Sequence, residues 1–193
     1  MPLTPSLEEL QRRIGLYDDE TAYKELFFAF HKPLLQFAHS FVQSPEIAEE
    51  VVSDVFINIW ERRQQMEDIK NLRVYLYICT KNASLKYLLK QQKHIAITID
   101  DLKVELESPH NNPEQLLLTA EMRNRIQQAV NQLPPRCKII FKLIKEDGLK
   151  YREVAEILNL SVKTVDNQLA TALRKIGNAI NIDLRKVIRF WLQ

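Results

Sequence analysis

Residues 148–176 carry two apolar sets at helical spacing, and this pattern most constrains how the chain can fold. The first set is Val154, Ala155, Leu158 and Leu160, and the second is Val165, Leu169, Ala172, Leu173 and Ile176. Between the sets, Asn159 tolerates the left-handed conformation of a tight turn, and Ser161 is a good N-cap for the next helix. The stretch therefore predicts a helix-turn-helix, whose second helix fits a DNA major groove. An ordinary helical hairpin in an all-α core is the alternative.

The second helix also offers polar side chains that suit DNA. Amides can read adenine, Asp can accept a hydrogen bond from cytosine, and Lys and Arg neutralise phosphates. A merely solvated helix more often carries Glu and Lys alone. The residues that point outward or flank the outward face are Lys163, Thr164, Asp166, Asn167, Gln168, Thr171, Arg174 and Lys175. DNA binding is the favoured interpretation.

Composition predicts helices nearly throughout, because the chain has only three glycines, 46% hydrophobic residues and few alternating β-branched runs. No apolar run approaches the roughly 18–20 residues of a membrane span. The first residues lack the basic and apolar regions of a signal peptide, so we expect a cytoplasmic protein without stable membrane insertion. Cys79 and Cys137 lie far apart and share no metal-ligand spacing with the histidines. We therefore expect reduced thiols, no metal site and no cofactor.

Charge is arranged in blocks along the chain. Residues 43–61 contain five acids and no Lys or Arg, whereas residues 62–93 contain eight Lys or Arg against two acids. Residues 94–122 are acidic again, and residues 136–193 carry twelve Lys or Arg against six acids. Two basic regions that flank an acidic connector are typical of a bipartite nucleic-acid binder.

Local signals place the other helices. Residues 1–17 read as a short arm or a weak helix without an assigned function, and a helix is expected to start near Asp18 or Asp19. Pro33 predicts a break or kink. Ser44-Pro45-Glu46 predicts a new start, with a helix to about Arg63, and a further helix covers about residues 72–92. Loop residues then predict a linker, and helices resume at about 114–132 and 136–147.

Several stretches resemble one known family when taken together. Residues 45–60 resemble the second conserved region of bacterial RNA polymerase sigma factors, and residues 74–82 resemble the promoter-melting segment that follows it. Residues 133–141 and the helix-turn-helix resemble the fourth region. The order, the spacing and the short linker are similar to those of the extracytoplasmic-function group of the sigma-70 family. The resemblance covers about residues 20–92 and 114–180.

The resemblance implies an all-α fold of two small helical domains joined by a flexible linker, the second ending in the helix-turn-helix. The implied bounds are 1–93 for the region 2-like domain, 94–113 for the linker and 114–193 for the region 4-like domain. The implied function is to bind core RNA polymerase, recognise the minus-ten and minus-thirty-five promoter elements and promote DNA melting. The implied partners are the beta-prime clamp helices and beta flap of the polymerase, promoter DNA and an anti-sigma factor.

The resemblance also implies roles for individual residues. Those expected to dock on the polymerase are Glu49, Glu50, Val52, Asp54, Val55 and Phe56. Those expected at the minus-ten element are Tyr75, Lys81, Asn82, Lys86 and Lys90. The loop Gln64–Asn71 would help to shape a pocket there for an unpaired base. Those expected at the minus-thirty-five element are Lys163, Thr164, Asp166, Asn167, Gln168, Thr171 and Arg174.

The chain departs from the family pattern at some positions. The family usually has Trp at the position of Tyr75, Gln at Ser53, Asp at Lys86 and Arg at Leu89, and often Ser at Lys150. Without Ser at position 150, the first helix of the helix-turn-helix is expected to be weakly capped. These differences bear on which promoter sequence the chain recognises and on individual residue contacts, more than on the class of protein.

Two other functions compete with this interpretation. A transcription activator with a helical sensor domain would bind its operator without polymerase, but it leaves the acidic helix without a role. A helical enzyme is disfavoured, because the sequence shows no paired carboxylates, metal cluster, Gly-rich phosphate loop or activated nucleophile.

Overall fold

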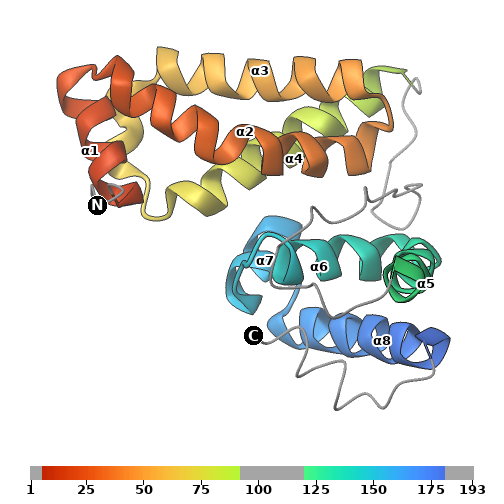
Figure 1. The fold of residues 1–193 in the computed structure, drawn as a ribbon. Helices are drawn as coiled ribbons and strands as arrows, with labels where there is room; N and C mark the ends of the chain where they lie inside the picture. Colours follow the sequence, from red (N-terminus) through yellow and green to blue (C-terminus); the bar gives the residue numbers. More distant parts are fainter. Residues whose placement is uncertain (1–5, 92–119, 181–193) are drawn as a thin grey trace. The chain divides into compact units, whose positions relative to one another are not determined.

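The computed structural model describes residues 6–91 and 120–180, and all regular structure within these ranges is helical (Figure 1). The predicted all-α class is therefore confirmed for the described residues. The chain divides into two compact units, Met1–Ala96 and Ile97–Gln193. The predicted linker and the carboxy-terminal tail lie outside the described residues.

The first unit contains α1 (Leu7–Tyr17), α2 (Glu20–Val42), α3 (Pro45–Glu61), the 3-10 helix η1 (Arg63–Asp68) and α4 (Leu72–Gln91). Helix α2 packs against both α3 and α4, and α1 packs against η1 and α2 (Figure 1). Phe37 of α2 is fully buried, with its ring centroid 5.1 Å from those of Phe41 and Tyr77. The core of this unit thus joins α2 to α4.

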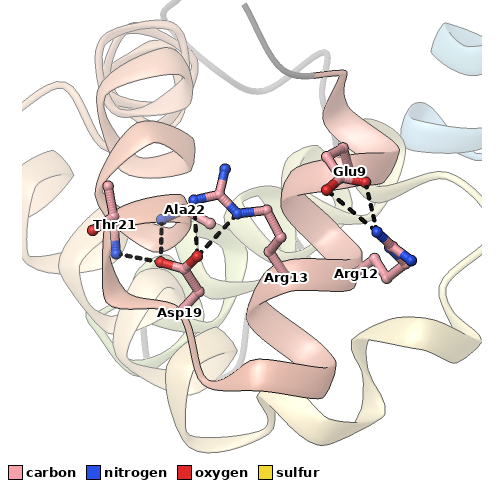
Figure 2. A network of polar contacts seen from close by, with 6 residues as sticks. All are labelled: Glu9, Arg12, Arg13, Asp19, Thr21 and Ala22. Carbon is pink, nitrogen blue, oxygen red and sulfur yellow. Dashed lines mark hydrogen bonds and ion pairs between the residues drawn. The ribbon is translucent and has the colours of Figure 1, made fainter.

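Local capping explains where α2 and α3 begin. The Asp19 carboxylate accepts hydrogen bonds from the N–H groups of Thr21 (2.9 Å) and Ala22 (3.0 Å) and pairs with Arg13 (Figure 2). The bond from Ala22 and the pair with Arg13 lower the pKa of Asp19. Ser44 Oγ accepts the N–H of Ile47, and Pro45 is the first residue of α3. Both predicted helix starts are confirmed.

Of the break or kink expected at Pro33, the break is absent, because α2 continues through this residue. Proline inside a helix removes one ladder bond and clashes with the preceding turn, at a cost of about 3 kcal/mol. Leu26 on one side of Pro33 and Leu34 and Phe37 on the other are fully buried in the same core. Each such side chain contributes about 1.5–3 kcal/mol, which offsets the cost of the proline.

The buried face of α4 does not follow its apolar positions alone. These positions are Leu72, Tyr75, Leu76, Cys79, Leu85, Leu88 and Leu89. Tyr77, Thr80 and Ser84 are buried with Leu72 and Leu76, and Leu89 is exposed. Thr80 and Ser84 donate hydrogen bonds to the carbonyl oxygens of the residues four positions earlier, at 2.9 and 2.8 Å. With their hydroxyls satisfied in this way, these small polar residues can lie in the core.

The second unit contains α5 (Ala120–Asn131), α6 (Pro135–Lys145), α7 (Tyr151–Leu158) and α8 (Val162–Ile180). Helix α8 packs against the other three helices of this unit (Figure 1). Gly148 has φ 65°, which a residue without Cβ adopts freely, and it turns the chain from α6 toward α7. The fully buried Lys142 places Nζ 2.9 Å from Asp147 Oδ1, which holds the end of α6 beside this turn.

The predicted helix-turn-helix is confirmed as α7 and α8. Asn159 has φ 54°, and Ser161 Oγ accepts the N–H of Thr164 at 3.0 Å. Both predicted apolar sets are buried apart from Leu160, which is half-buried. At the start of α7 the Lys150 side chain forms no cap, and the carboxylate of Glu153 accepts the Lys150 N–H at 2.8 Å.

Candidate nucleic-acid and partner interfaces

The outward face of α8 is centred on a stripe of four positions. Lys163, Asn167, Ala170 and Arg174 are exposed and recur at helical spacing, with the exposed Asp166 beside them. The sequence interpretation omitted Ala170, because an alanine offers no hydrogen bond. Its small side chain leaves room for a close approach of a base edge between Asn167 and Arg174, and alanine can contact a thymine methyl group.

The other predicted residues of α8 lie at the edge of this face rather than at its centre. Gln168 is half-buried, and its Oε1 accepts the Cys137 thiol of α6 at 2.8 Å. Thr171 is half-buried, and its hydroxyl donates to the carbonyl oxygen of Asn167 at 2.9 Å. Thr164 is half-buried, with its hydroxyl 2.8 Å from that of Ser161. The most exposed face of α8 therefore runs through Asn167, Ala170 and Arg174, with Gln168 and Thr171 at its edge.

The start of α7 adds two residues that sequence reasoning did not select. Tyr151 and Arg152 are exposed at the amino-terminal end of this helix. Burial raises the pKa of Tyr151, and the negative charge of Asp166 on α8 raises it further. Tyr151 and Arg152 add a hydroxyl and a guanidinium group to the exposed surface of the helix-turn-helix.

Helix α3 presents a stripe of exposed carboxylates, here called the acidic stripe. Its members are Glu46, Glu49, Glu50, Asp54 and Glu61, with the apolar Ile57 among them. The side chain of Ile57 is 54% exposed, although the sequence interpretation gave it no role. A charged face with one exposed apolar residue is suited to a basic partner that has an apolar groove.

Three residues predicted to dock on a partner are buried in the free chain. Val52, Val55 and Phe56 are at most 4% exposed, and Val55 also lines the groove between α3 and α4. The phenol of Tyr23 on α2 donates to the carbonyl oxygen of Phe56 at 2.8 Å. These residues fix the orientation of α3, and hence of the acidic stripe.

One carboxylate of the acidic stripe, that of Glu49, pairs with a histidine of α2. His31 Nε2 lies 3.1 Å from Glu49 Oε2, and the rings of Phe27 and His31 have centroids 4.6 Å apart. The sequence spacing could not reveal this pair, because the two residues come from different helices. Glu49 is therefore less available to an outside cation than Glu50 or Asp54.

A groove of about 390 Å³ runs between α3 and α4, and we call it the helix groove. Its lining residues are Glu50, Val51, Asp54, Val55, Asn58, Ile59, Arg62, Tyr75, Cys79, Asn82, Ala83, Lys86, Tyr87 and Lys90. The structure thus brings together four of the five residues predicted for the minus-ten element. Arg62, Lys86 and Lys90 supply positive charge, and the aromatic and amide side chains can contact bases.

Lys81 is the fifth predicted minus-ten residue, and it does not line the helix groove. It is half-buried on a different side of α4, where burial lowers its pKa. The basic character of α4 was visible in the sequence, but the side on which each lysine lies depends on the packing of the helix.

A second groove of about 260 Å³ lies beside η1, and we call it the loop groove. Its lining residues are Ile59, Arg62, Gln65, Met66, Asp68, Ile69 and Tyr75. Ile59, Arg62 and Tyr75 line both grooves, so the two grooves adjoin at these residues. The expectation that Gln64–Asn71 shapes a pocket agrees with this lining, although part of that segment is a 3-10 helix rather than a loop.

The described residues offer neither a membrane-spanning helix nor a cluster of metal ligands. None of the described helices is long and apolar enough to cross a membrane. Residues 6–91 and 120–180 contain no group of three or more His, Cys, Asp or Glu side chains that could hold a metal ion. The two units expose acidic, basic, amide and aromatic side chains, which are suited to binding proteins and nucleic acids.

Two family models match this chain: Sigma-70 region 2 over residues 26–94 and Sigma-70, region 4 over residues 123–176. The chain is 25% identical over 175 residues to the ECF RNA polymerase sigma-E factor of Escherichia coli K12, covering 87% of this chain and 91% of that protein. It is 22% identical over 176 residues to the RNA polymerase sigma-H factor of Pseudomonas aeruginosa, with the same coverage.

Two solved structures share the fold. One is CnrH in complex with the cytosolic domain of CnrY, with a TM-score of 0.56 and 19% identity over 89% of this chain and 95% of that chain. The other is the sigma factor RpoE in complex with the anti-sigma factor NepR from Bartonella quintana, with a TM-score of 0.54 and 18% identity over 83% and 98%.

Proposed function

This chain belongs to the sigma-70 family, in its extracytoplasmic-function group, and we propose which of its surfaces bind core RNA polymerase and promoter DNA. The observation that carries the proposal is the groove between α3 and α4, whose lining holds two members of the acidic stripe, Glu50 and Asp54, together with Arg62, Lys86 and Lys90. One small unit thus presents both a surface for a basic protein partner and a surface for a nucleic-acid strand.

The acidic stripe of α3 is the proposed contact with the beta-prime clamp helices of the polymerase. Glu50 and Asp54 supply exposed negative charge, and Ile57 supplies apolar area that a partner can bury. Charge pairs across such an interface steer association, while a desolvated apolar anchor supplies most of the affinity. In the carboxy-terminal unit we expect a contact with the beta flap.

The two grooves of the first unit are the proposed binding site for the unpaired strand of the minus-ten element. Tyr75 lies where the grooves adjoin, and Asn82 lines the helix groove. An aromatic ring can stack on a base, an amide can bind a base edge, and the three basic residues neutralise the backbone. The loop groove is a concave site of suitable chemistry for a base that has left the duplex.

Helix α8 is the proposed reader of the minus-thirty-five element in the major groove. Asn167 presents an amide at the centre of the exposed stripe, and Lys163 and Arg174 lie nearer its ends. The amide can discriminate adenine, whereas the basic residues can bind phosphates. Tyr151 and Arg152 at the start of α7 are proposed to contact the DNA backbone beside it.

A titration with core polymerase tests the docking surface. The double variant Glu50→Lys, Asp54→Lys is expected to lose binding to core polymerase, because it reverses two charges of the proposed interface. The matched control is Glu8→Lys, Glu20→Lys, which makes the same charge change at exposed positions outside the acidic stripe. Circular dichroism establishes that each variant is folded. Equal polymerase affinity for the two double variants would disprove the docking assignment.

We further infer that an anti-sigma factor regulates this chain. The support is that one of the solved structures with this fold is a complex of a sigma factor with an anti-sigma factor. We expect the chain to act in the cytoplasm, as a binding protein without catalytic activity of its own. The activator hypothesis is not favoured, because the region 2 match over residues 26–94 gives the amino-terminal unit a different role.

A further inference from the structure

We propose that helix α1, through Gln11, sets the shape of the loop groove and thereby how the unpaired promoter strand is read. The inference rests on the proposed function of that groove. Helix α1 lies before residue 26, where the region 2 match begins, so the match assigns it no role. Gln11 lines neither groove, and it is therefore a positioning residue.

The side-chain amide of Gln11 is bound to the loop that forms the groove. Gln11 is 9% exposed, and its Nε2 donates to the carbonyl oxygens of Met66 (2.5 Å) and Ile69 (2.7 Å). Both hydrogens of the amide group are used. Two carbonyl oxygens can accept hydrogen bonds only from the NH₂ group of the amide, so these two acceptors fix which end of the Gln11 amide faces the loop.

The bond to Met66 reinforces the end of η1. The carbonyl oxygen of Met66 also accepts the N–H of Ile69 at 3.0 Å, which is the last hydrogen bond of the 3-10 turn. A 3-10 helix has poorer hydrogen-bond geometry than an α-helix and is stable only in short pieces. Gln11 supplies additional bonds at the point where such a turn opens most readily.

Close packing supports the same contact. A Cβ atom added to Gly15 would lie 3.2 Å from the carbonyl oxygen of Arg63 and 3.5 Å from Cγ of Glu67, so α1 approaches η1 as closely as a glycine allows. Asp18, which follows α1, pairs with Arg63 Nε. Polar bonds and a tight backbone approach therefore hold α1 on the loop independently of each other.

The consequence for the loop groove follows from its lining. Met66 and Ile69 receive the bonds from Gln11, and both also line the groove that we assign to an unpaired base. A shift of α1 is therefore expected to move two walls of this site, whereas α1 itself carries no residue of the acidic stripe. Because recognition of a base requires correctly placed groups, the shape of this loop affects promoter opening and base preference.

The test uses Gln11→Met, which keeps the length of the side chain but has no donor, and Gly15→Ala, which disturbs the packing instead. Arg12→Met is the matched control, since Arg12 is exposed and pairs only with Glu9 on the same helix in the described residues. Holoenzyme with each full-length variant is assayed for polymerase affinity, for closed-complex formation and for the rate of opening a promoter. Hydrogen exchange of residues 63–71 is measured in the free chain.

Gln11→Met and Gly15→Ala are each expected to keep polymerase affinity and closed-complex formation and to slow promoter opening. For Gln11→Met, exchange in residues 63–71 is expected to rise at least about tenfold, because two hydrogen bonds to buried carbonyl groups are lost. Selection from promoters randomised at the minus-ten element is expected to yield a broader set of sequences. Arg12→Met is expected to match the natural chain in all five measurements.

Opening rate and base preference equal to those of the natural chain in both Gln11→Met and Gly15→Ala would overturn the inference. A uniform loss of polymerase affinity, closed complexes and opening would also overturn it, because that result indicates general destabilisation. If Gln11→Met does not fold, Gly15→Ala alone decides between these outcomes. Failure of the natural chain itself to open a promoter with core polymerase would instead contradict the proposed function.

Discussion

Ile57 is the only large hydrophobic side chain of α3 that is exposed, and it lies within the acidic stripe. Its replacement by Ser is expected to weaken polymerase binding about tenfold, because burying an aliphatic side chain contributes about 1.5–3 kcal/mol and half of Ile57 is already covered. Leu89→Ser is the control, since Leu89 is 44% exposed on α4. Fluorescence anisotropy with core polymerase measures both. Equal dissociation constants for Ile57→Ser and the natural chain would remove Ile57 from the interface.

Asn82 and Lys81 are neighbours in the sequence, but only Asn82 lines the helix groove. We expect Asn82→Ala to impair promoter melting strongly, since contacts to an unpaired base contribute about 1–3 kcal/mol. Lys81→Ala is expected to have the smaller effect, because its side chain lies on another side of α4. Permanganate footprinting of unpaired thymines measures the melting. A larger defect in Lys81→Ala than in Asn82→Ala would show that the strand follows a different path.

Asn167 and Gln168 both carry amides, but the Gln168 amide already takes part in a hydrogen bond within the protein, with Cys137. Asn167→Ala is expected to relax base preference at one or two upstream pairs, at a cost of about 1–3 kcal/mol for a lost bidentate contact. Gln168→Ala is expected to change it less, because the carbonyl oxygen of Gln168 accepts the Cys137 thiol. Selection from randomised minus-thirty-five elements with holoenzyme compares the variants. If Gln168→Ala relaxes the selected sequence and Asn167→Ala does not, the outward face of α8 is assigned wrongly.

At the scale of the element, the turn before the helix-turn-helix depends on a buried ion pair. The side chains of Lys142 and Asp147 are 2% and 6% exposed, with Nζ and Oδ1 2.9 Å apart. Asp147→Ala is expected to lower the free energy of unfolding of the second unit by about 3 kcal/mol, because it leaves a buried ammonium group with the more distant Glu146. Urea denaturation followed by circular dichroism measures this. A loss below 1 kcal/mol would mean that water or Glu146 replaces the missing carboxylate.

Helix starts and turns could be predicted from the sequence because their signals are local. Asp19, Ser44 and Ser161 cap the residues directly after them, and Asn159 adopts its left-handed conformation within a short turn. The path of α2 through Pro33 could not be predicted in this way. It depends on burial contributed by helices that are distant in the sequence.

The candidate sites show the same division between local and distant information. The charge blocks and the helix-turn-helix residues were visible along the chain, and both indicated a nucleic-acid binder; the family followed from the resemblance of several stretches taken together. The side of the helix on which each residue lies was less predictable, because it depends on how that helix packs against helices distant in the sequence. Val52, Val55 and Phe56 are buried, Gln168 faces α6, and the pair of His31 with Glu49 joins two helices.

At the scale of the whole molecule, the surfaces proposed to bind DNA belong to two separate compact units. We expect the free chain to bind promoter DNA weakly and to gain specificity only with core polymerase. A second contact adds affinity only when its distance from the first matches the spacing of the two DNA elements, and the polymerase can hold that spacing. Gel shifts with and without core polymerase measure this. Tight, sequence-specific binding by the chain alone would support the activator hypothesis instead.

The position of Tyr75 in both grooves has a consequence for redesigning promoter choice. A substitution there changes two cavities at once, so altered base preference at the minus-ten element comes together with altered strand separation. The exposed stripe of α8 belongs to the other compact unit, and its residues line neither groove. Substitutions in α8 are therefore better suited than substitutions in α4 to make variants that use new promoters and still open them at the natural rate.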